Sequence, residues 1–116
     1  MSSLDDAYCP DDGDFIWIDF DPRLGHEQAG RRPALVLSPR SYNRKVGLCV
    51  VCPVTGRSKG FPFEVSVPEG LEVRGVVLAD QVRSVSWGER QAAYFCPAPQ
   101  QIRRDVRAKL KALLSF

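Results

Sequence analysis

The residues best suited to chemistry lie in one short segment, residues 24–33, which reads LGHEQAGRRP. This segment contains a titratable base (His26), a carboxylate (Glu27) and a fixed cation (Arg32). Imidazole and carboxylate groups can accept and return protons, while a guanidinium stays charged and can bind two phosphate oxygens at once. The segment therefore predicts acid–base chemistry on an anionic substrate. A surface loop with an ordinary ion pair is the alternative.

The charge distribution also favours an anionic partner. The net charge is only +2, but residues 1–22 contain seven Asp and no Lys or Arg. Residues 23–60 contain eight Lys or Arg and one acid, Glu27, so eight minus one gives this segment a charge of +7. Such a block attracts phosphate-bearing or strongly acidic molecules through counterion release and long-range steering. The alternative is a solvated basic face that the acidic N-terminal residues balance.

Length and composition indicate one globular domain. A chain of 116 residues can close one hydrophobic core, and 44% hydrophobic and 26% charged residues are typical of globular proteins. The apolar runs are much shorter than the roughly 20 residues of a membrane helix, and no signal-peptide pattern precedes them. We therefore expect a cytoplasmic protein with a single domain over residues 1–116, in which residues 1–12 form a flexible lead-in.

Short apolar segments separated by Gly and Pro predict a mostly β fold with six strands. These segments span residues 15–20, 33–38, 46–54, 61–67, 75–86 and 92–96. The fifth segment is long enough to bend around a barrel. Many short strands with such turns are typical of a small β-barrel or sandwich.

One amphipathic α-helix is predicted after Pro99. Its apolar residues recur at helical spacing and are Ile102, Val106, Leu110, Leu113 and Leu114. Arg and Lys residues occupy the opposite face. We expect the apolar stripe to pack on the strands and the basic face to be solvated, with a contact to nucleic acid as the alternative.

The four cysteines are expected to be buried free thiols. Cys49 and Cys52 have a C-x-x-C spacing, but they lie in a predicted strand, where residues three apart point to opposite faces. Their sulfurs would therefore not converge on one zinc ion. Cys9 and Cys96 have no close cysteine partner in the sequence. We predict neither a metal site nor a cofactor.

Several blocks of this sequence closely resemble the MazF/PemK/Kid toxin family, and the MazF branch more than Kid. The blocks are GDFIWIDFDP at 13–22, GHEQAGRRPALVLSP at 25–39, YN at 42–43, CPVT at 52–55, SKGFPFEV at 58–65 and GVVLADQVRS at 75–84. They keep their order and spacing over about residues 13–114. The resemblance implies an SH3-like (CcdB/PemK-type) barrel with a C-terminal α-helix.

The resemblance also implies an activity, that of the toxin of a type II toxin–antitoxin system. Family enzymes are metal-independent endoribonucleases that cut single-stranded RNA at short sequence motifs and so inhibit translation. The 2′-hydroxyl of the RNA attacks the adjacent phosphorus and leaves a 2′,3′-cyclic phosphate and a 5′-hydroxyl. The residues Gly56 and Arg57 depart from the family in a region expected to contact bases, so the cleavage sequence cannot be transferred from a relative.

The resemblance assigns catalytic roles to named residues. Arg32 stands at the position of the catalytic arginine and Thr55 at that of the threonine beside it. Both could stabilise the phosphorus oxyanions, and Arg32 could also protonate the departing 5′-oxygen, because an alkoxide is a stronger base than neutral guanidine. The alternative for Thr55 is a turn residue before Gly56.

The general base stays open among three residues. Glu27 matches the candidate of the MazF branch, whereas His26 and Asp80 match residues with catalytic roles in Kid. Leu78 stands where Kid carries a catalytic arginine, so the Kid arrangement cannot be transferred whole. Glu27 is favoured, with His26 as the alternative base or as a contact to RNA.

Single-stranded RNA is usually held by stacking on aromatic rings and by cations on its phosphates. We expect Phe20 to stack on a base, Lys59 to hold phosphate, and Gln81 and Arg83 to hydrogen-bond base edges or backbone. His26 and Asp80 complete the expected RNA-binding set. Trp17 is expected in the core.

The resemblance further implies a homodimer with its grooves near the interface. A MazE-like antitoxin would insert a flexible acidic C-terminal tail there and compete with RNA for the cations. Promoter DNA would be contacted only through the antitoxin complex, and no membrane is expected. The alternatives are a non-catalytic SH3-like module that binds nucleic acid or protein, a CcdB-like gyrase inhibitor, and a degenerate toxin retained as a structural partner.

Overall fold

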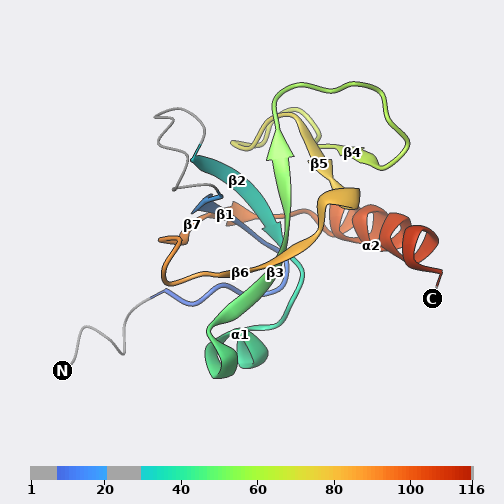
Figure 1. Ribbon diagram of the computed structural model, residues 1–116. Helices are drawn as coiled ribbons and strands as arrows, with labels where there is room; N and C mark the ends of the chain where they lie inside the picture. Colours follow the sequence, from blue (N-terminus) through green and yellow to red (C-terminus); the bar gives the residue numbers. More distant parts are fainter. Residues whose placement is uncertain (1–7, 21–29, 116) are drawn as a thin grey trace.

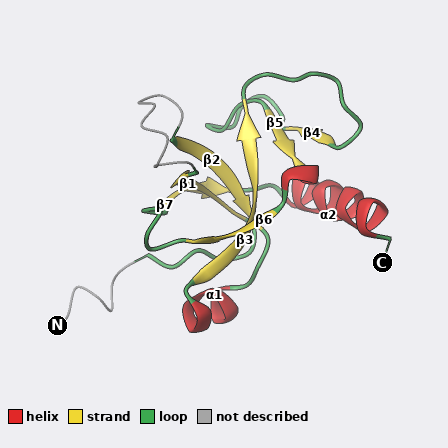
Figure 2. Cartoon of the chain, viewed as in Figure 1, coloured by secondary structure: helices red, strands yellow, loops and turns green. Residues whose placement is uncertain are grey.

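The computed structural model describes residues 8–20 and 30–115, and within them the chain forms seven short β-strands, two α-helices and one 3-10 helix. In chain order these are β1 (Asp14–Asp19), β2 (Arg31–Val36), α1 (Arg40–Val46), β3 (Leu48–Thr55), β4 (Glu64–Ser66), β5 (Val76–Leu78), the 3-10 helix η2 (Ala79–Gln81), β6 (Arg83–Ser86), β7 (Ala93–Pro97) and α2 (Gln100–Leu114). Figure 2 shows how strands dominate the fold. The prediction of a mostly β fold with a C-terminal helix is confirmed. No helix of the described residues is long and apolar enough to cross a membrane.

The strands form one antiparallel sheet in the order β4-β5-β3-β2-β1-β7, and β6 pairs with the first half of β3. Strand β3 is therefore central, because it pairs with β2 on one side and with both β5 and β6 on the other. Within the described residues these pairings form an open path from β4 to β7. Helix α2 lies beside β4 and β5, whereas α1 lies at the start of β3 (Figure 1).

The single long strand predicted over residues 75–86 is wrong, because η2 divides it. Val77 pairs with Val54 of β3, and Arg83 pairs with Val51. Between these pairs, β3 spans two residues and the other segment spans five, residues 78–82. The three extra residues cannot stay in register, so they leave the ladder as η2. The strand predicted over residues 61–67 is also shorter and begins only at Glu64.

Two hydrophobic cores lie on opposite faces of the sheet. The first includes Ile102, Val106 and Leu110 of α2, as the helical spacing predicts, whereas Leu113 and Leu114 are exposed beyond it. The second lies between β1, β2, β3 and β6. Cys52 belongs to the first core and Cys49 to the second. The prediction that these two thiols are buried on opposite faces is therefore confirmed.

Residues 8–12 are packed against α1, a helix that the sequence analysis did not predict. Cys9 and Pro10 are buried, and the Pro10 carbonyl oxygen accepts a hydrogen bond from Asn43 Nδ2 at 2.8 Å. Asn43 Nδ2 also donates to the Ser38 carbonyl at 3.0 Å, and Trp87 Nε1 donates to the Asn43 carbonyl at 2.9 Å. The flexible lead-in predicted for residues 1–12 therefore cannot include this packed part. Residues 1–7 lie outside the described residues.

Candidate functional site

Arg32 and Thr55 come from neighbouring strands, at the end of the sheet where β2 begins and β3 ends. In the β2–β3 ladder, Ala34 pairs with Pro53. Continuing this register by two residues places Arg32 opposite Thr55. Directly opposed residues in an antiparallel pair point to the same face, with Cβ atoms about 4.5–5.5 Å apart. The observed ladder ends at Ala34 and Pro53, and its direction carries the two residues that the sequence analysis placed on one phosphate to the same end of the sheet.

Both residues line a pocket of about 410 Å³ at this end of the sheet. Its lining residues are Arg32, Thr55, Arg57, Lys59, Phe61, Glu64, Leu78, Asp80 and Gln81. Five of the nine are residues that the sequence analysis proposed for catalysis or RNA binding, including Lys59, Asp80 and Gln81. The extra residues at η2 supply Asp80 and Gln81, so the break in the predicted strand serves the site.

The charges of the pocket suit an anion. Three cations (Arg32, Arg57 and Lys59) and two carboxylates line it, which leaves an excess of one positive charge. Within residues 8–20 and 30–115, none of these cations forms an ion pair, whereas the adjacent Arg31 is bound to Asp19 at 3.1 Å. In the described part of the chain, the Arg32 guanidinium is therefore available to a ligand.

The segment that carries Lys59 is held by the carboxylate of Glu64. Glu64 accepts hydrogen bonds from Ser58 Oγ at 2.7 Å, from the Lys59 amide at 2.9 Å and from the Gly60 amide at 3.2 Å. The hydrogen bond from Ser58 and then that from the Lys59 amide lower the pKa of Glu64, because they stabilise the ionised form. Glu64 thus orders the rim of the pocket in its charged state.

Thr55 is oriented by the turn that follows β3. Its Oγ1 accepts a hydrogen bond from the Arg57 amide at 3.3 Å. A hydroxyl has one proton to donate, and this contact leaves that proton free. Thr55 can therefore donate to an oxygen atom bound beside Arg32.

Phe20 and Arg83 are not among the residues that line this pocket. Phe20 is 8% exposed and belongs to the second core with Ile16 and Ile18. The guanidinium carbon of Arg83 lies over the Phe20 ring at 5.5 Å from its centroid. The expectation that Phe20 offers an open ring to a base therefore does not hold in this structure. Trp17, expected in the core, is half-buried and stacks on Phe95 with ring centroids 4.6 Å apart.

Phe61 is the aromatic residue that sequence reasoning missed. It lines the pocket and is 59% exposed, the largest exposed fraction among the large hydrophobic residues of the described chain. The sequence indicated this role only through Pro62, because the residue before a proline is restricted to an extended backbone. Phe61 also precedes β4, so its ring does not belong to a strand face.

His26 and Glu27 lie outside the described residues. The segment that carries them leaves β1 at Phe20 and returns at Gly30, where the Phe20 amide donates to the Gly30 carbonyl at 2.6 Å. Gly30 directly precedes Arg31 and Arg32, at the end of the sheet where the pocket lies.

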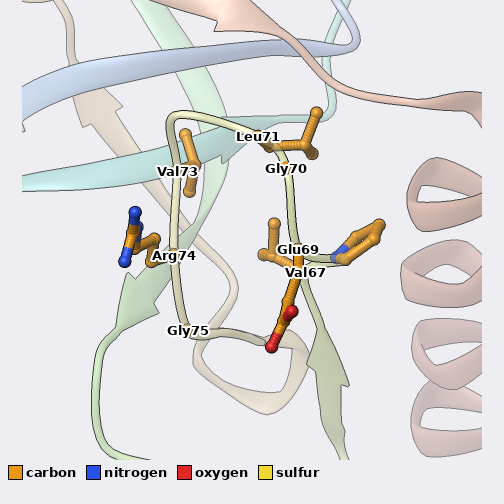
Figure 3. Close-up of a pocket in the computed structure, with 8 residues that line it drawn as sticks. Val67, Glu69, Gly70, Leu71, Val73, Arg74 and Gly75 are labelled. Carbon is orange, nitrogen blue, oxygen red and sulfur yellow. The ribbon is translucent and has the colours of Figure 1, made fainter.

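A larger hollow, of about 470 Å³, lies within the loop that joins β4 to β5. Its two sides face each other, with Val67 and Glu69 on one and Val73 and Arg74 on the other (Figure 3). None of the predicted site residues lines it. Size therefore does not identify the site, and the pocket of Arg32 and Thr55 is the one with groups placed for chemistry.

Comparison with known proteins identifies the family of this chain. Residues 11–114 match the family described as PemK-like, MazF-like toxin of type II toxin-antitoxin system. The chain is 52% identical over 108 residues to the endoribonuclease toxin MazF of Escherichia coli K12, which covers 92% of this chain and 96% of that protein.

Solved structures give the same result. The crystal structure of MazF from Deinococcus radiodurans has a TM-score of 0.87 and 53% identity, covering 95% of this chain and 100% of that one. A crystal structure of MazE–MazF from the same organism has a TM-score of 0.85 and 48% identity, covering 95% and 99%. This chain therefore belongs to the family of PemK-like, MazF-like toxins of type II toxin–antitoxin systems.

Proposed function

We propose that this protein is an endoribonuclease toxin that cuts single-stranded RNA in the pocket of Arg32 and Thr55. The observation that carries the proposal is the meeting of these two side chains with Lys59, Asp80 and Gln81 in one pocket. The relatives named as endoribonucleases support the same activity and disfavour a non-catalytic SH3-like module or a gyrase inhibitor.

The reaction is a transesterification at phosphorus. The ribose 2′-oxygen bonds to the adjacent phosphorus as its proton passes to a base, and the bond from phosphorus to the 5′-oxygen breaks. Arg32 and Thr55 bind the oxygens on which negative charge grows, and preorganised donors of this kind are usually the largest contribution to catalysis. The 5′-oxygen takes up a proton, from Arg32 or from water. The products are a 2′,3′-cyclic phosphate and a 5′-hydroxyl, and the charge that a metal ion would supply comes from Arg32.

Glu27 is the preferred base, with His26 and Asp80 as the other choices. Asp80 gains support from its place in the pocket, and its carboxylate is exposed to solvent. Glu27 and His26 gain support from the chain order, because their segment rejoins the sheet beside Arg32. A carboxylate within hydrogen-bond reach of the 2′-hydroxyl suffices for this role.

The RNA is bound along the rim of the same pocket. Lys59 and Arg57 hold phosphates, and Gln81 hydrogen-bonds a base edge. We assign base stacking to Phe61 in place of Phe20, because an exposed ring next to cations suits an unpaired base. Arg83, whose guanidinium lies over the Phe20 ring, contacts RNA outside the pocket in this proposal.

The proposed partners follow from the charge of the pocket and from the relatives. The MazE–MazF structures of Deinococcus radiodurans support a MazE-like antitoxin for this chain. An acidic C-terminal tail of that antitoxin would occupy the cations that bind RNA. We further propose a homodimer, and a cytoplasmic site of action because mRNA is there.

The test is to incubate the purified protein with a mixed-sequence RNA, with and without EDTA, and to map the new ends. We expect cuts at a defined short sequence that leave 5′-hydroxyl and 2′,3′-cyclic phosphate ends. Intact RNA at high protein concentration would instead support a binding module. Random cutting that EDTA abolishes would point to a contaminating metal-dependent nuclease.

A further inference from the structure

The segment over residues 58–62 forms one side of the pocket and is not part of a strand. It carries Lys59 and Phe61. The Phe61 carbonyl accepts a hydrogen bond from the Glu64 amide at 3.2 Å. Two side chains outside the segment hold it. Glu64 binds its first half, as described above, and Lys109 of α2 binds its second half.

Lys109 reaches the segment from helix α2. Its Nζ donates a hydrogen bond to the Pro62 carbonyl oxygen at 2.6 Å. Lys109 does not line the pocket of Arg32; it lines a separate hollow between β4 and α2, of about 420 Å³. Pro62 lies in the turn before β4, and no backbone amide of the described residues outside the strand ladders donates to its carbonyl, so the ammonium supplies that contact.

Helix α2, which carries Lys109, is held against the sheet by buried apolar side chains. Val106 and Leu110, on either side of Lys109 in the sequence, are buried in the first core with Val65 of β4. Elements fixed by buried apolar contacts open less readily than exposed loops. The hydrogen bond from Lys109 to Pro62 therefore joins the loop over residues 58–62 to a helix that buried apolar contacts hold in place.

We propose that Lys109 is a positioning residue for RNA binding. Its ammonium fixes the Pro62 carbonyl and, through it, keeps Lys59 and Phe61 on the pocket rim. This inference rests on the proposed function, because it assigns RNA contacts to those two residues. Lys109 itself touches neither RNA nor the reacting atoms.

A simple charge effect has to be separated from positioning, because any lysine near the site attracts RNA. Lys111 is the matched control. It lies two residues further along α2, is exposed, and makes no side-chain hydrogen bond or ion pair within the described part of the chain. Replacing either lysine by Met removes the same charge, but only Lys109→Met removes the contact to Pro62.

The experiment compares Lys109→Met, Lys109→Arg and Lys111→Met in two measurements. Cleavage of an RNA oligonucleotide gives KM and kcat, and hydrogen exchange gives the protection of the Lys59 and Gly60 amides, which donate to Glu64. For Lys109→Met we expect KM to rise roughly three- to tenfold with little change in kcat, about the effect of one ordinary hydrogen bond, and faster exchange of both amides. Lys109→Arg keeps a donor and should therefore restore most of the normal KM and most of the amide protection. Lys111→Met should change neither KM nor amide exchange.

Two outcomes would overturn the proposal. Equal increases of KM in the two Met variants would mean that only charge matters. Unchanged exchange, or faster exchange without a change in KM, would mean that Lys109 does not position the RNA contacts. If the unmodified protein cuts no RNA, the proposed function fails, while the exchange measurement still decides whether Lys109 holds the segment.

Discussion

Gly75 lies so close to Thr55 that a Cβ atom on Gly75 would be 2.0 Å from the Thr55 carbonyl oxygen. The backbone of Gly75 also has a φ angle of +112°, which side chains other than hydrogen rarely allow. Gly75 precedes β5, and Val76 of that strand pairs with Thr55. The absence of a side chain at residue 75 therefore decides where Thr55 lies.

Gly75→Ala should consequently impair both stability and cleavage, because the backbone of Thr55 must move. Gly70→Ala is the matched control, since Gly70 has a φ angle of +98° but no atom within 4 Å of its would-be Cβ. We expect Gly70→Ala to cost about 1–3 kcal/mol of unfolding free energy with normal cleavage per folded molecule. Gly75→Ala should cost more and also lose cleavage, as urea unfolding and RNA assays would measure. Equal behaviour of the two variants would mean that the approach to Thr55 is unimportant.

Arg32→Ala should remove nearly all cleavage while the fold persists. The reason is that the exposed Arg32 has no ion pair in the described residues and lines the pocket, so its loss removes a charge from the site and little from the fold. Arg31→Ala is the control, because it breaks the ion pair to Asp19 but leaves the pocket intact. Cleavage rates and circular dichroism melting would be compared. Unfolding of Arg32→Ala would show that Arg32 is structural.

Thr55→Val should lower the cleavage rate about a hundredfold or more, because it removes one hydroxyl donor to the oxyanion at nearly constant volume. Thr55→Ser keeps that hydroxyl and should keep most of the rate. The turn contact from the Arg57 amide to Oγ1 is lost only in the Val variant. A normal rate in Thr55→Val would reduce Thr55 to a turn residue.

The base can be assigned from rate profiles against pH for Glu27→Gln and Asp80→Asn. Removal of the true base should abolish the rise in rate that accompanies its deprotonation, and the other variant should keep it. We expect Glu27→Gln to lose that rise. If Asp80→Asn loses it instead, the arrangement is closer to the one implied by Kid, and if neither does, His26 becomes the base to test.

The buried thiols should be inert and should couple stability to alkaline pH. Burial raises the pKa of Cys49 and that of Cys52 to about 12, and in the case of Cys52 the negative charge of Asp80 adds to the effect. The folded protein binds these protons more tightly than the unfolded chain, so the stabilisation is complete below pH 9.0 and is lost as pH rises toward about 12. Unfolding at increasing pH should show this loss. Cys49→Ala with Cys52→Ala should flatten it, and rapid labelling of either thiol at about pH 8 in the native protein would contradict it.

Much of the fold was predictable because its signals are local. The alternation of strand residues and the 3.6-residue period of α2 place apolar side chains on one face, and this holds for Ile102, Val106 and Leu110. The alternation also predicts that Phe20 is buried, because Phe20 falls on the same face as the buried Ile16 and Ile18. The interpretation of Phe20 as a stacking ring departed from that rule.

Helix α1 could not be predicted in the same way, because its stability comes from distant contacts. It has seven residues and one buried side chain, Asn43, which binds the backbone of Pro10 and Ser38. A local hint existed in Pro39 before the helix and in Gly47 after it, where φ is +77°. The site was easier, since the motif residues Arg32 and Thr55 meet through a strand register. The role of Phe61 depends on a loop that no periodicity describes.

The 3-10 helix η2, over residues 79–81, lies between two strands of the scaffold and also supplies residues to the pocket. Strands β5 and β6 pair with β3 before and after it. Within the break, Ala79 is buried in the first core, whereas Asp80 and Gln81 are exposed. Because Asp80 and Gln81 are exposed and line the pocket, we expect their substitution to cost the fold little and to change the lining of the pocket. If RNA binds there, such substitutions would alter which sequence is cut while the scaffold stays the same.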